Sequence, residues 1–431
     1  MLYIKERPGE NIVVRAARVL DPTEGIDATL DVRIDGGMIA AIGESLDRNE
    51  HRVVDGAGLV LTPAFVDPHV HLRTPGREDE ETIATGTAAA AAGGFCAILA
   101  MPNTDPVVDS AATLGALVET AARQAEVAVG FLAAITRGQK GEELTEMAEL
   151  ADSGAVAFSD DGVPVASAGM MRRALQYASI TGRKLALHCE ERSLSSDGQV
   201  HEGTVAAELG FHGYPSVAES VMVERDLALA GYEGQPVHLL HLSSADSVAA
   251  LRRARAASIE ATAEVTPHHL VLTDEAVRTL DANMKMNPPL RSAEDRTALI
   301  EALQDGTIEC IATDHAPHAL HEKDVPFEAA PFGVTGLETA FAVVHTHLVR
   351  GGVLPLATVI ERMTAGPARV FGLDRPRVAV GATANLALLD LEREWTVETF
   401  KSRSRNSWLL GETLVGQVAM TIAGGAVAFE R

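Results

Sequence analysis

Eight short apolar runs alternate with helical patterns along the middle of the chain, and this alternation constrains the fold more than any other feature. The runs cover residues 61–72, 94–103, 127–135, 155–162, 184–190, 237–243, 259–270 and 308–318. The helical patterns cover 79–92, 110–124, 142–154, 168–182, 217–231, 245–258 and 293–306, and several begin near Asp, Ser or Glu and end in Gly, as capped helices do. Apolar strands that alternate with helices pair in parallel, so this region predicts a closed (β/α)8 barrel of the TIM type within an α/β fold.

The two ends of the chain have a different pattern from the middle. Strand patterns cover 11–20, 31–43, 51–63, 382–391 and 416–430, and Asp-Gly or Gly-Gly turns punctuate them. Neither end has enough strands for a good sheet, but together they could form one. We therefore expect a small β-sandwich domain made of residues 1–62 plus 374–431, and a barrel made of residues 63–373.

Composition excludes several classes of function. The net charge of −24 argues against nonspecific binding to nucleic acid or to acidic membranes, although a local arginine could still bind an anionic substrate. The three cysteines lie far apart, which argues against disulfides and thiolate zinc sites and favours a reducing compartment. An uncharged stretch at 83–102 is as long as a membrane span, but Gly93 and Gly94 divide it into a predicted helix and strand. With no secretory signal at the N-terminus, we expect a cytoplasmic protein.

Side chains that can bind metal ions cluster at the carboxyl ends of the predicted barrel strands. In chain order they are His69, His71, Asn103, Asp160, Asp161, His188, His241, Asp314, His315 and His318. The carboxyl ends of barrel strands converge on one mouth, where the active sites of such barrels lie. Each of these residues is weak support alone, and their shared position is what indicates a metal site.

The first pair illustrates the reasoning. Residues i and i+2 of a strand point to the same face, so His69 and His71 could bind one ion through neutral imidazoles, although an isolated pair is more often two ordinary strand histidines. The candidate ligands exceed the four of a tetrahedral zinc, so we expect two divalent ions with a bridging carboxylate. Spacing does not decide whether Asp160 or Asp161 bridges. Zinc suits this set of ligands, with manganese or cobalt as alternatives.

The chain also resembles a known family through eight motifs in the same order. They are DPHVHLR, MPNT, FSDDGV, ALHCEE, AEVTPHHL, KMNPPLR, IATDHAPH and APFGVTGLET. These motifs closely resemble those of dihydroorotases of the bacterial single-function type, within the amidohydrolase superfamily. The resemblance implies a binuclear metal centre in a distorted barrel. It also implies the reversible interconversion of N-carbamoyl-L-aspartate and L-dihydroorotate, a step in pyrimidine synthesis.

Matched residue by residue, the family pattern assigns roles to twelve positions. One metal would be bound by His69, His71 and Asp314 and the other by His188 and His241, with Asp161, which the motif favours over Asp160, as the bridge. Asp314 would also transfer the proton. The substrate would contact Arg73, Asn103, Asn287, His318 and the backbone around Phe332 and Gly333.

Two alternatives share parts of this pattern. A hydantoinase or allantoinase would have the same barrel and metals, but many such relatives bridge the ions with a carboxylated lysine, and the run 155–162 contains no lysine. A non-catalytic scaffold for aspartate carbamoyltransferase should have lost metal ligands, whereas this chain keeps the full set. We expect a homodimer, and the sequence leaves open whether it associates with that transferase.

Overall fold

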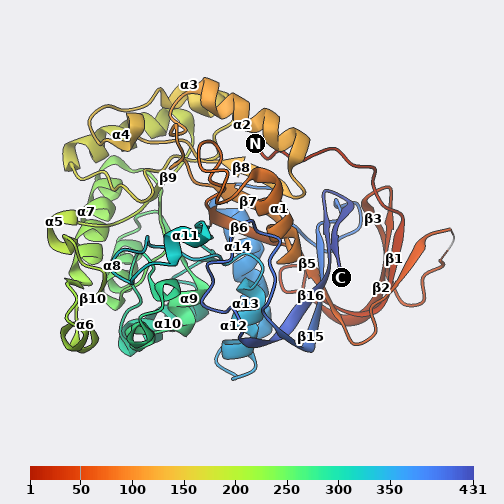
Figure 1. Cartoon of the computed structure of the whole chain (residues 1–431). Coiled ribbons are helices and arrows are strands. Elements are labelled where there is room, and N and C mark those ends of the chain that lie inside the picture. The colour runs from red at the N-terminus through yellow and green to blue at the C-terminus, as the bar shows by residue number, and fades with distance from the viewer. Residues whose placement is uncertain (49) are drawn as a thin grey trace.

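The computed structural model describes residues 1–48 and 50–431, and its central part is a ring of parallel strands (Figure 1). The strands are β6 (Phe65–Val70), β7 (Phe95–Ala100), β8 (Ala128–Phe131), β9 (Leu185–Leu187), β12 (Val237–Leu239), β13 (Ala261–Val265) and β14 (Cys310–Ile311). Strands β6, β7 and β8 pair in parallel in that order, and so do β9, β12, β13 and β14.

Single bridges join these two sheets into a closed barrel. Phe158 pairs in parallel with Ala133 on one side and with Leu185 on the other, and Val70 pairs in parallel with His315. The predicted run 155–162 is therefore the fourth barrel strand, although it pairs only at Phe158. Its ladder ends there because the Asp160 carboxylate, instead of a neighbouring strand, accepts the backbone N–H groups that follow β8.

Helices cover the outside of the ring, and every one of the seven predicted helices is present. They are α1 (Ile83–Ala92), α2 (Ala111–Gln124), α3 (Met147–Asp152), α4 (Ala168–Thr181), α7 (Val217–Glu233), α8 (Ala245–Ala256) and α10 (Ala293–Asp305). Four of them begin at a serine whose hydroxyl accepts a backbone N–H of the first turn: Ser110, Ser167, Ser244 and Ser292. Capping chemistry thus explains why the sequence located these helices well.

Shorter elements lie mainly in the loops and towards the end of the barrel. They are α5 (Arg192–Ser195), β10 (Val200–His201), α6 (Thr204–Leu209), β11 (Gly213–Tyr214), α9 (Pro267–Val271), α11 (Leu320–Lys323), α12 (Ala340–Val344), α13 (Leu356–Met363) and α14 (Ala365–Val370), with η1 (Arg137–Gln139), η2 (Asp274–Thr279), η3 (Ala282–Met284) and η4 (His345–Val349). Several predicted runs are longer than the strands they contain, and the run 259–270, for example, is a strand only as far as Val265. Thr266 caps helix α9 and Pro267 occupies its first turn, which stops the strand.

The uncharged stretch 83–102 is helix α1 followed by β7, as the sequence predicted. Among the described residues, no helix is both long enough and apolar enough to cross a bilayer.

Strands from both ends of the chain form one sheet beside the barrel. They are β1 (Ile12–Asp21), β2 (Ile26–Asp35), β3 (Met38–Gly43), β4 (Arg52–Asp55), β5 (Val60–Pro63), β15 (Leu386–Thr396), β16 (Thr413–Ala423) and β17 (Ala426–Glu430). Strands β5 and β15 pair antiparallel and so join the two ends, and β4 pairs with β1. Gly36 and Gly37 both have positive φ angles, of 56° and 82°, which lets them form the tight turn between β2 and β3.

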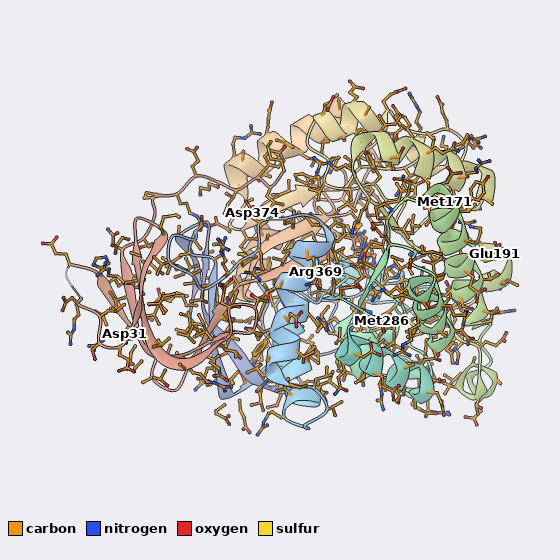
Figure 2. The ribbon with its side chains drawn as sticks, turned by 180° about the vertical axis from the view of Figure 1, so that it is seen from behind. Asp31, Met171, Glu191, Met286, Arg369 and Asp374 are labelled. Carbon is orange, nitrogen blue, oxygen red and sulfur yellow. The ribbon has the colours of Figure 1, made fainter. Side chains whose placement is uncertain are left out.

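This sheet folds over its own apolar core, so that the molecule consists of a barrel and a small β-sandwich. Ile34 of β2, Ile39 of β3, Leu386 of β15 and Ile422 of β16 belong to one buried cluster. Figure 2 shows Asp31 of β2 at one end of the molecule and Met171 of α4 at the other. The fold class predicted from the sequence is confirmed, and the boundaries at 62/63 and 373/374 stay a prediction.

Candidate active site

The six side chains predicted as metal ligands lie together at the barrel mouth. They are His69, His71, Asp161, His188, His241 and Asp314. His69 belongs to β6, and the others follow β6, the Phe158 segment, β9, β12 and β14 within a few residues. Parallel strands end at one rim, so residues far apart in the sequence meet there. The rings of His69 and His71 are 5.3 Å apart between centroids, as expected for neighbours on one face of a strand.

Asp161 lies between two pairs of histidines. Its Oδ2 is 3.6 Å from Nε2 of His69 and 3.5 Å from Nε2 of His71. Its Oδ1 is 3.5 Å from Nδ1 of His188 and 3.6 Å from Nε2 of His241. Each carboxylate oxygen therefore faces a different pair, which is the arrangement that a bridging ligand requires.

Asp160 points away from the mouth. Its carboxylate accepts hydrogen bonds from the backbone N–H groups of Ile135 and Thr136 and from the hydroxyl of Thr136. Burial raises the pKa of Asp160 to about 6, and those hydrogen bonds oppose the increase. Asp160 is thus committed to the loop after β8, while Asp161 faces the histidines.

Three of the four histidines are oriented by an oxygen acceptor behind the ring. His69 Nδ1–H donates to Glu264 Oε1 at 2.7 Å and His71 Nδ1–H donates to Asn103 Oδ1 at 2.9 Å. His188 Nε2–H donates to Glu190 Oε2 at 3.2 Å. Each bond fixes the tautomer, so that the other ring nitrogen presents its lone pair to the mouth.

The mouth therefore collects acceptors without donors to pair with them. His69 Nε2 is buried with no hydrogen-bond partner. His188 Nδ1 and His241 Nε2 lie 2.9 Å apart, and the oxygens of Asp161 and Asp314 are also acceptors. Two groups of ligand atoms lie close enough to hold one ion each: His69, His71 and Asp314, and His69, Asp161 and His241. Nitrogen and carboxylate ligands without donors suit a cation, so these residues fit a divalent metal centre.

The electrostatics of the mouth favour positive charge. Burial by itself would lower the pKa of His188, but Asp161 and Glu190 outweigh it and raise this pKa to about 9, so a proton and a metal ion would compete for the lone pair of Nδ1. Burial also opposes ionisation of Asp314, yet His69 and His71 hold the pKa of this carboxyl well below its usual range. The two aspartates therefore remain ionised and attract cations.

The backbone is strained at three positions around the mouth. Arg73, His241 and Asp314 have φ angles of 55°, 30° and 47°, in the left-handed region that residues with a side chain rarely adopt. Such strain is typical of sites where the surrounding structure fixes a side chain for function.

A cavity of about 190 Å³ opens beside these ligands, and every predicted substrate residue lines it. The lining includes Arg73, Asn103, Asn287, His318, Phe332 and Gly333, together with His71, Asp161, His188, His241 and Asp314. This volume suits a small molecule rather than a polymer. Because Arg73 supplies positive charge to the cavity, the cavity can bind an anionic group next to the metal ligands.

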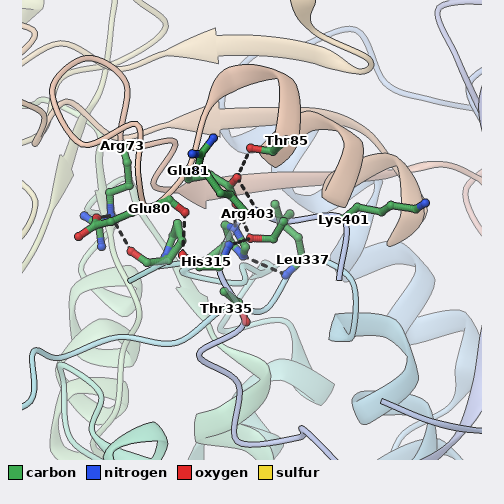
Figure 3. Close-up of polar contacts among 12 residues, drawn as sticks. Arg73, Glu80, Glu81, Thr85, His315, Thr335, Leu337, Lys401 and Arg403 are labelled. Atoms are coloured by element: carbon green, nitrogen blue, oxygen red, sulfur yellow. Dashed lines mark hydrogen bonds and ion pairs between the residues drawn. The ribbon is translucent and has the colours of Figure 1, made fainter. Parts of the chain in front are cut away.

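Arg73 is held from behind by a carboxylate that the sequence did not indicate (Figure 3). Its Nε donates to the Pro317 carbonyl at 3.0 Å and lies 3.0 Å from Oε2 of Glu80. Glu80 is 1% exposed and also pairs with Arg77, so this one carboxylate only partly offsets the charge of Arg73. Burial lowers the pKa of Arg73, and Glu80 opposes that decrease. His315, the sequence candidate next to Asp314 after β14, instead donates to Glu81 at 3.1 Å and lies outside the cavity.

Glu264 is the second residue that sequence reasoning missed. It is fully buried in β13 and accepts from His69 Nδ1 at 2.7 Å, from His238 Nε2 at 3.0 Å and from the backbone N–H of His241 at 3.3 Å. The available signal was a lone acidic residue in an apolar strand, since such a charge needs partners when buried. His238 is one of those partners.

Comparisons with known proteins agree with this geometry. The structure superposes on an L-hydantoinase (dihydropyrimidinase) from Arthrobacter aurescens with a TM-score of 0.87 and 25% identity over 98% of this chain and 96% of that one. A D-hydantoinase gives a TM-score of 0.84 at 24% identity, over 98% of this chain and 95% of that one. Fold and site together define a hydrolase of the cyclic amidohydrolase class, with side chains that fit a divalent metal centre.

The particular family follows from the sequence comparisons. A family model described as dihydro-orotase-like matches residues 58–247. Dihydroorotases from Geotalea daltonii and Geobacillus kaustophilus are 46% and 49% identical, covering 98% and 93% of this chain and 100% and 94% of their own lengths. The chain belongs to the dihydroorotase family.

Proposed function

We propose that this protein is a dihydroorotase, which interconverts N-carbamoyl-L-aspartate and L-dihydroorotate in pyrimidine synthesis. One observation carries the proposal: a single small cavity has Arg73 on its wall together with the cluster of Asp161, Asp314 and histidines. A substrate with a carboxylate beside a cyclic amide needs both features at once. The names of the relatives support the same conclusion.

The proposed cofactor is a pair of zinc ions, with Asp161 as the bridge. His69, His71 and Asp314 would hold one ion, and His188 and His241 the other. When bound, such ions polarise a carbonyl and make water a nucleophile at neutral pH. Among the residues that line the described cavity there is no lysine, which favours an aspartate bridge over a carboxylated lysine.

The residues of the chain would bind and orient the substrate. Arg73 Nε is already engaged by Pro317 and Glu80, so its two terminal nitrogens could grip the substrate carboxylate as a pair. Asn103 lines the same cavity and can donate a further hydrogen bond to that group from its amide, and His318 lines the cavity beside it. Asn287 has a buried Oδ1 without a partner, which could accept from a ring N–H.

Asp314 would move the proton. In hydrolysis, Asp314 takes a proton from the water that adds to the ring carbonyl, the ring C–N bond then breaks, and Asp314 delivers that proton to the departing nitrogen. In the direction of synthesis, Asp314 accepts the proton of the ureido nitrogen as this nitrogen attacks the side-chain carboxylate carbon, and passes it to the carboxylate oxygen that departs as hydroxide. Asp314 lies 3.0 Å from His71 Nε2, so its carboxylate is held at the edge of the metal site.

The test compares substrates of the rival enzymes. Zinc-loaded protein should open L-dihydroorotate far faster than hydantoin or allantoin, and Arg73→Ala should abolish that preference, while Arg123→Ala, at an exposed arginine, should not change it. Faster turnover of hydantoin by the parent protein would overturn the assignment.

The assembly and location of the protein belong to the same proposal. We propose a homodimer that acts in the cytoplasm, with aspartate carbamoyltransferase as a candidate partner. Sedimentation of the purified chain alone and mixed with the transferase tests both associations, and a single monomeric species in both runs would contradict them.

A further inference from the structure

Two lysines near the cavity are buried, although the proposed chemistry uses neither. Lys285 and Lys323 are 3% and 8% exposed. Lysine is almost never buried this deeply unless its ammonium group has partners that replace water. The partners of both lysines converge on residues 327–333, a segment that we call the strap.

Lys285 holds the first part of the strap. Its Nζ donates to the carbonyls of Phe327 and Glu328 at 2.9 and 3.0 Å, and to Oε1 of Gln199 at 3.3 Å. The same ammonium lies 5.4 Å from the ring centre of Phe327 and 4.9 Å from that of Phe332, within the range of cation–π attraction.

Lys323 holds the second part of the strap. Its Nζ donates to the Pro331 carbonyl at 2.8 Å and to the Ala282 carbonyl at 3.0 Å. Three carbonyls of the strap, those of Phe327, Glu328 and Pro331, are thus bound by ammonium groups. Lys285 itself and the Ala282 carbonyl, to which Lys323 also donates, belong to one other segment. The two lysines therefore tie the strap to the segment that contains Ala282 and Lys285.

The strap forms one wall of the substrate cavity. Phe332 and Gly333 both line it. The Phe332 carbonyl accepts from His318 Nε2 at 2.8 Å, and the Gly333 N–H donates to the Lys285 carbonyl at 2.9 Å. A Cβ atom on Gly333 would lie 2.6 Å from the Cβ of Ala316, so this wall has almost no space to shift inward.

Lys285 also connects the strap to a second residue of the cavity lining. It precedes Asn287 by two residues, and Asn287 lines the same cavity. We propose that Lys285 and Lys323 are positioning residues, which set the distance between the strap and Asn287 and thereby the fit of the substrate ring. This inference rests on the proposed function, because it assigns the fit to the ring of dihydroorotate. The metal ligands and Asp314 lie on the barrel strand ends and make none of these contacts.

The test uses Lys285→Met and Lys323→Met, which keep the length of the side chain but remove its donors. Each variant should raise the KM for L-dihydroorotate by about tenfold, because hydrogen bonds to a charged group are lost. The kcat and the zinc content should stay within about twofold of the parent values. Lys285→Arg, which keeps charge and donors, should recover most of the loss. Lys140→Met, at an exposed lysine, is the matched control.

Hydrogen exchange supplies a readout that does not depend on the substrate. In both methionine variants the amides of residues 327–330, 332 and 333 should exchange faster, while those of β6 and β12 should not change. An unchanged KM together with unchanged exchange in folded variants would overturn the proposal, and so would loss of zinc in place of a KM effect. If the parent protein did not process dihydroorotate, the proposed function would fail, and the exchange data would still decide whether the lysines hold the strap. If Lys285→Met does not fold, Lys323→Met still tests the proposal, because Lys323 binds the strap separately, at the Pro331 carbonyl.

Discussion

Replacing Glu264 with glutamine should weaken zinc binding without disturbing the fold. Glu264 accepts three hydrogen bonds, from His69 Nδ1, His238 Nε2 and the backbone of His241. In Glu264→Gln, the amide oxygen can still accept from His69 and His241. The new amide N–H₂ would face His238, which can change tautomer because its Nδ1 lies 2.9 Å from the Thr262 hydroxyl and can donate to it.

The magnitude follows from what this exchange removes. The hydrogen bonds survive, and the loss is the negative charge 2.7 Å from the His69 ring, whose Nε2 is the proposed metal ligand. Removal of a carboxylate behind a metal-binding histidine typically lowers affinity by about 10- to 100-fold, and we expect the lower end, about 1.4 kcal/mol. Glu264→Ala would instead leave three buried donors unpaired at about 1 to 3 kcal/mol each, comparable to the total stability of a domain, so it is not a useful test.

The assay is equilibrium competition for zinc against a chelator of known affinity, with circular dichroism to check the fold. Glu309→Gln is the matched control. Glu309 is partly buried and accepts the N–H of Ala263, in the same strand as Glu264, but it pairs with Arg255 away from the cavity. Folded Glu264→Gln that binds zinc as tightly as the parent would refute the reasoning, as would an equal loss in Glu309→Gln.

Four further predictions concern single residues. Asp314→Asn should reduce kcat by about 100-fold or more while the protein still binds substrate, because an amide cannot transfer the proton; steady-state kinetics would contradict this if kcat stayed near the parent value. Arg73→Lys should raise the KM for L-dihydroorotate by about tenfold or more, since a lysine cannot grip a carboxylate with two parallel hydrogen bonds, and an unchanged KM would mean that another group binds the carboxylate. Metal-free protein should regain full activity with zinc in bicarbonate-free buffer, and bicarbonate should not rescue Asp161→Ala; a lysine carrying the mass of one CO₂ would show that the bridge is misassigned. Burial raises the pKa of Glu338 from 4.5 to about 7, so between these pH values the folded state binds more protons than the unfolded chain, and stability falls as the pH rises. Glu338→Gln should therefore have a higher Tm than the parent at about pH 8 and lose this advantage at about pH 4. An equal Tm difference at both pH values would contradict burial of the charge as the cause.

The sequence alone determined the architecture of this protein. Apolar runs of strand length alternate with capped helices, and both signals are local, so they predicted the barrel and located seven of its helices. The Gly-Gly turns and strand patterns at both ends predicted the second sheet for the same reason. Because barrel strands end at one rim, position along the chain also predicted that His69, His188, His241 and Asp314 would meet.

The tertiary structure decided what depends on the direction of side chains and on contacts between distant residues. Asp160 and Asp161 are neighbours in the sequence and have the same side chain. The turn of the chain after Phe158 directs Asp160 to the loop after β8 and Asp161 to the histidines. Glu264 lies 195 residues from His69, and Glu80 supports Arg73 across a loop, so no local pattern revealed either contact. Packing brings such pairs together only after the barrel closes, and each buried charge is then stabilised by a partner that the sequence does not place beside it.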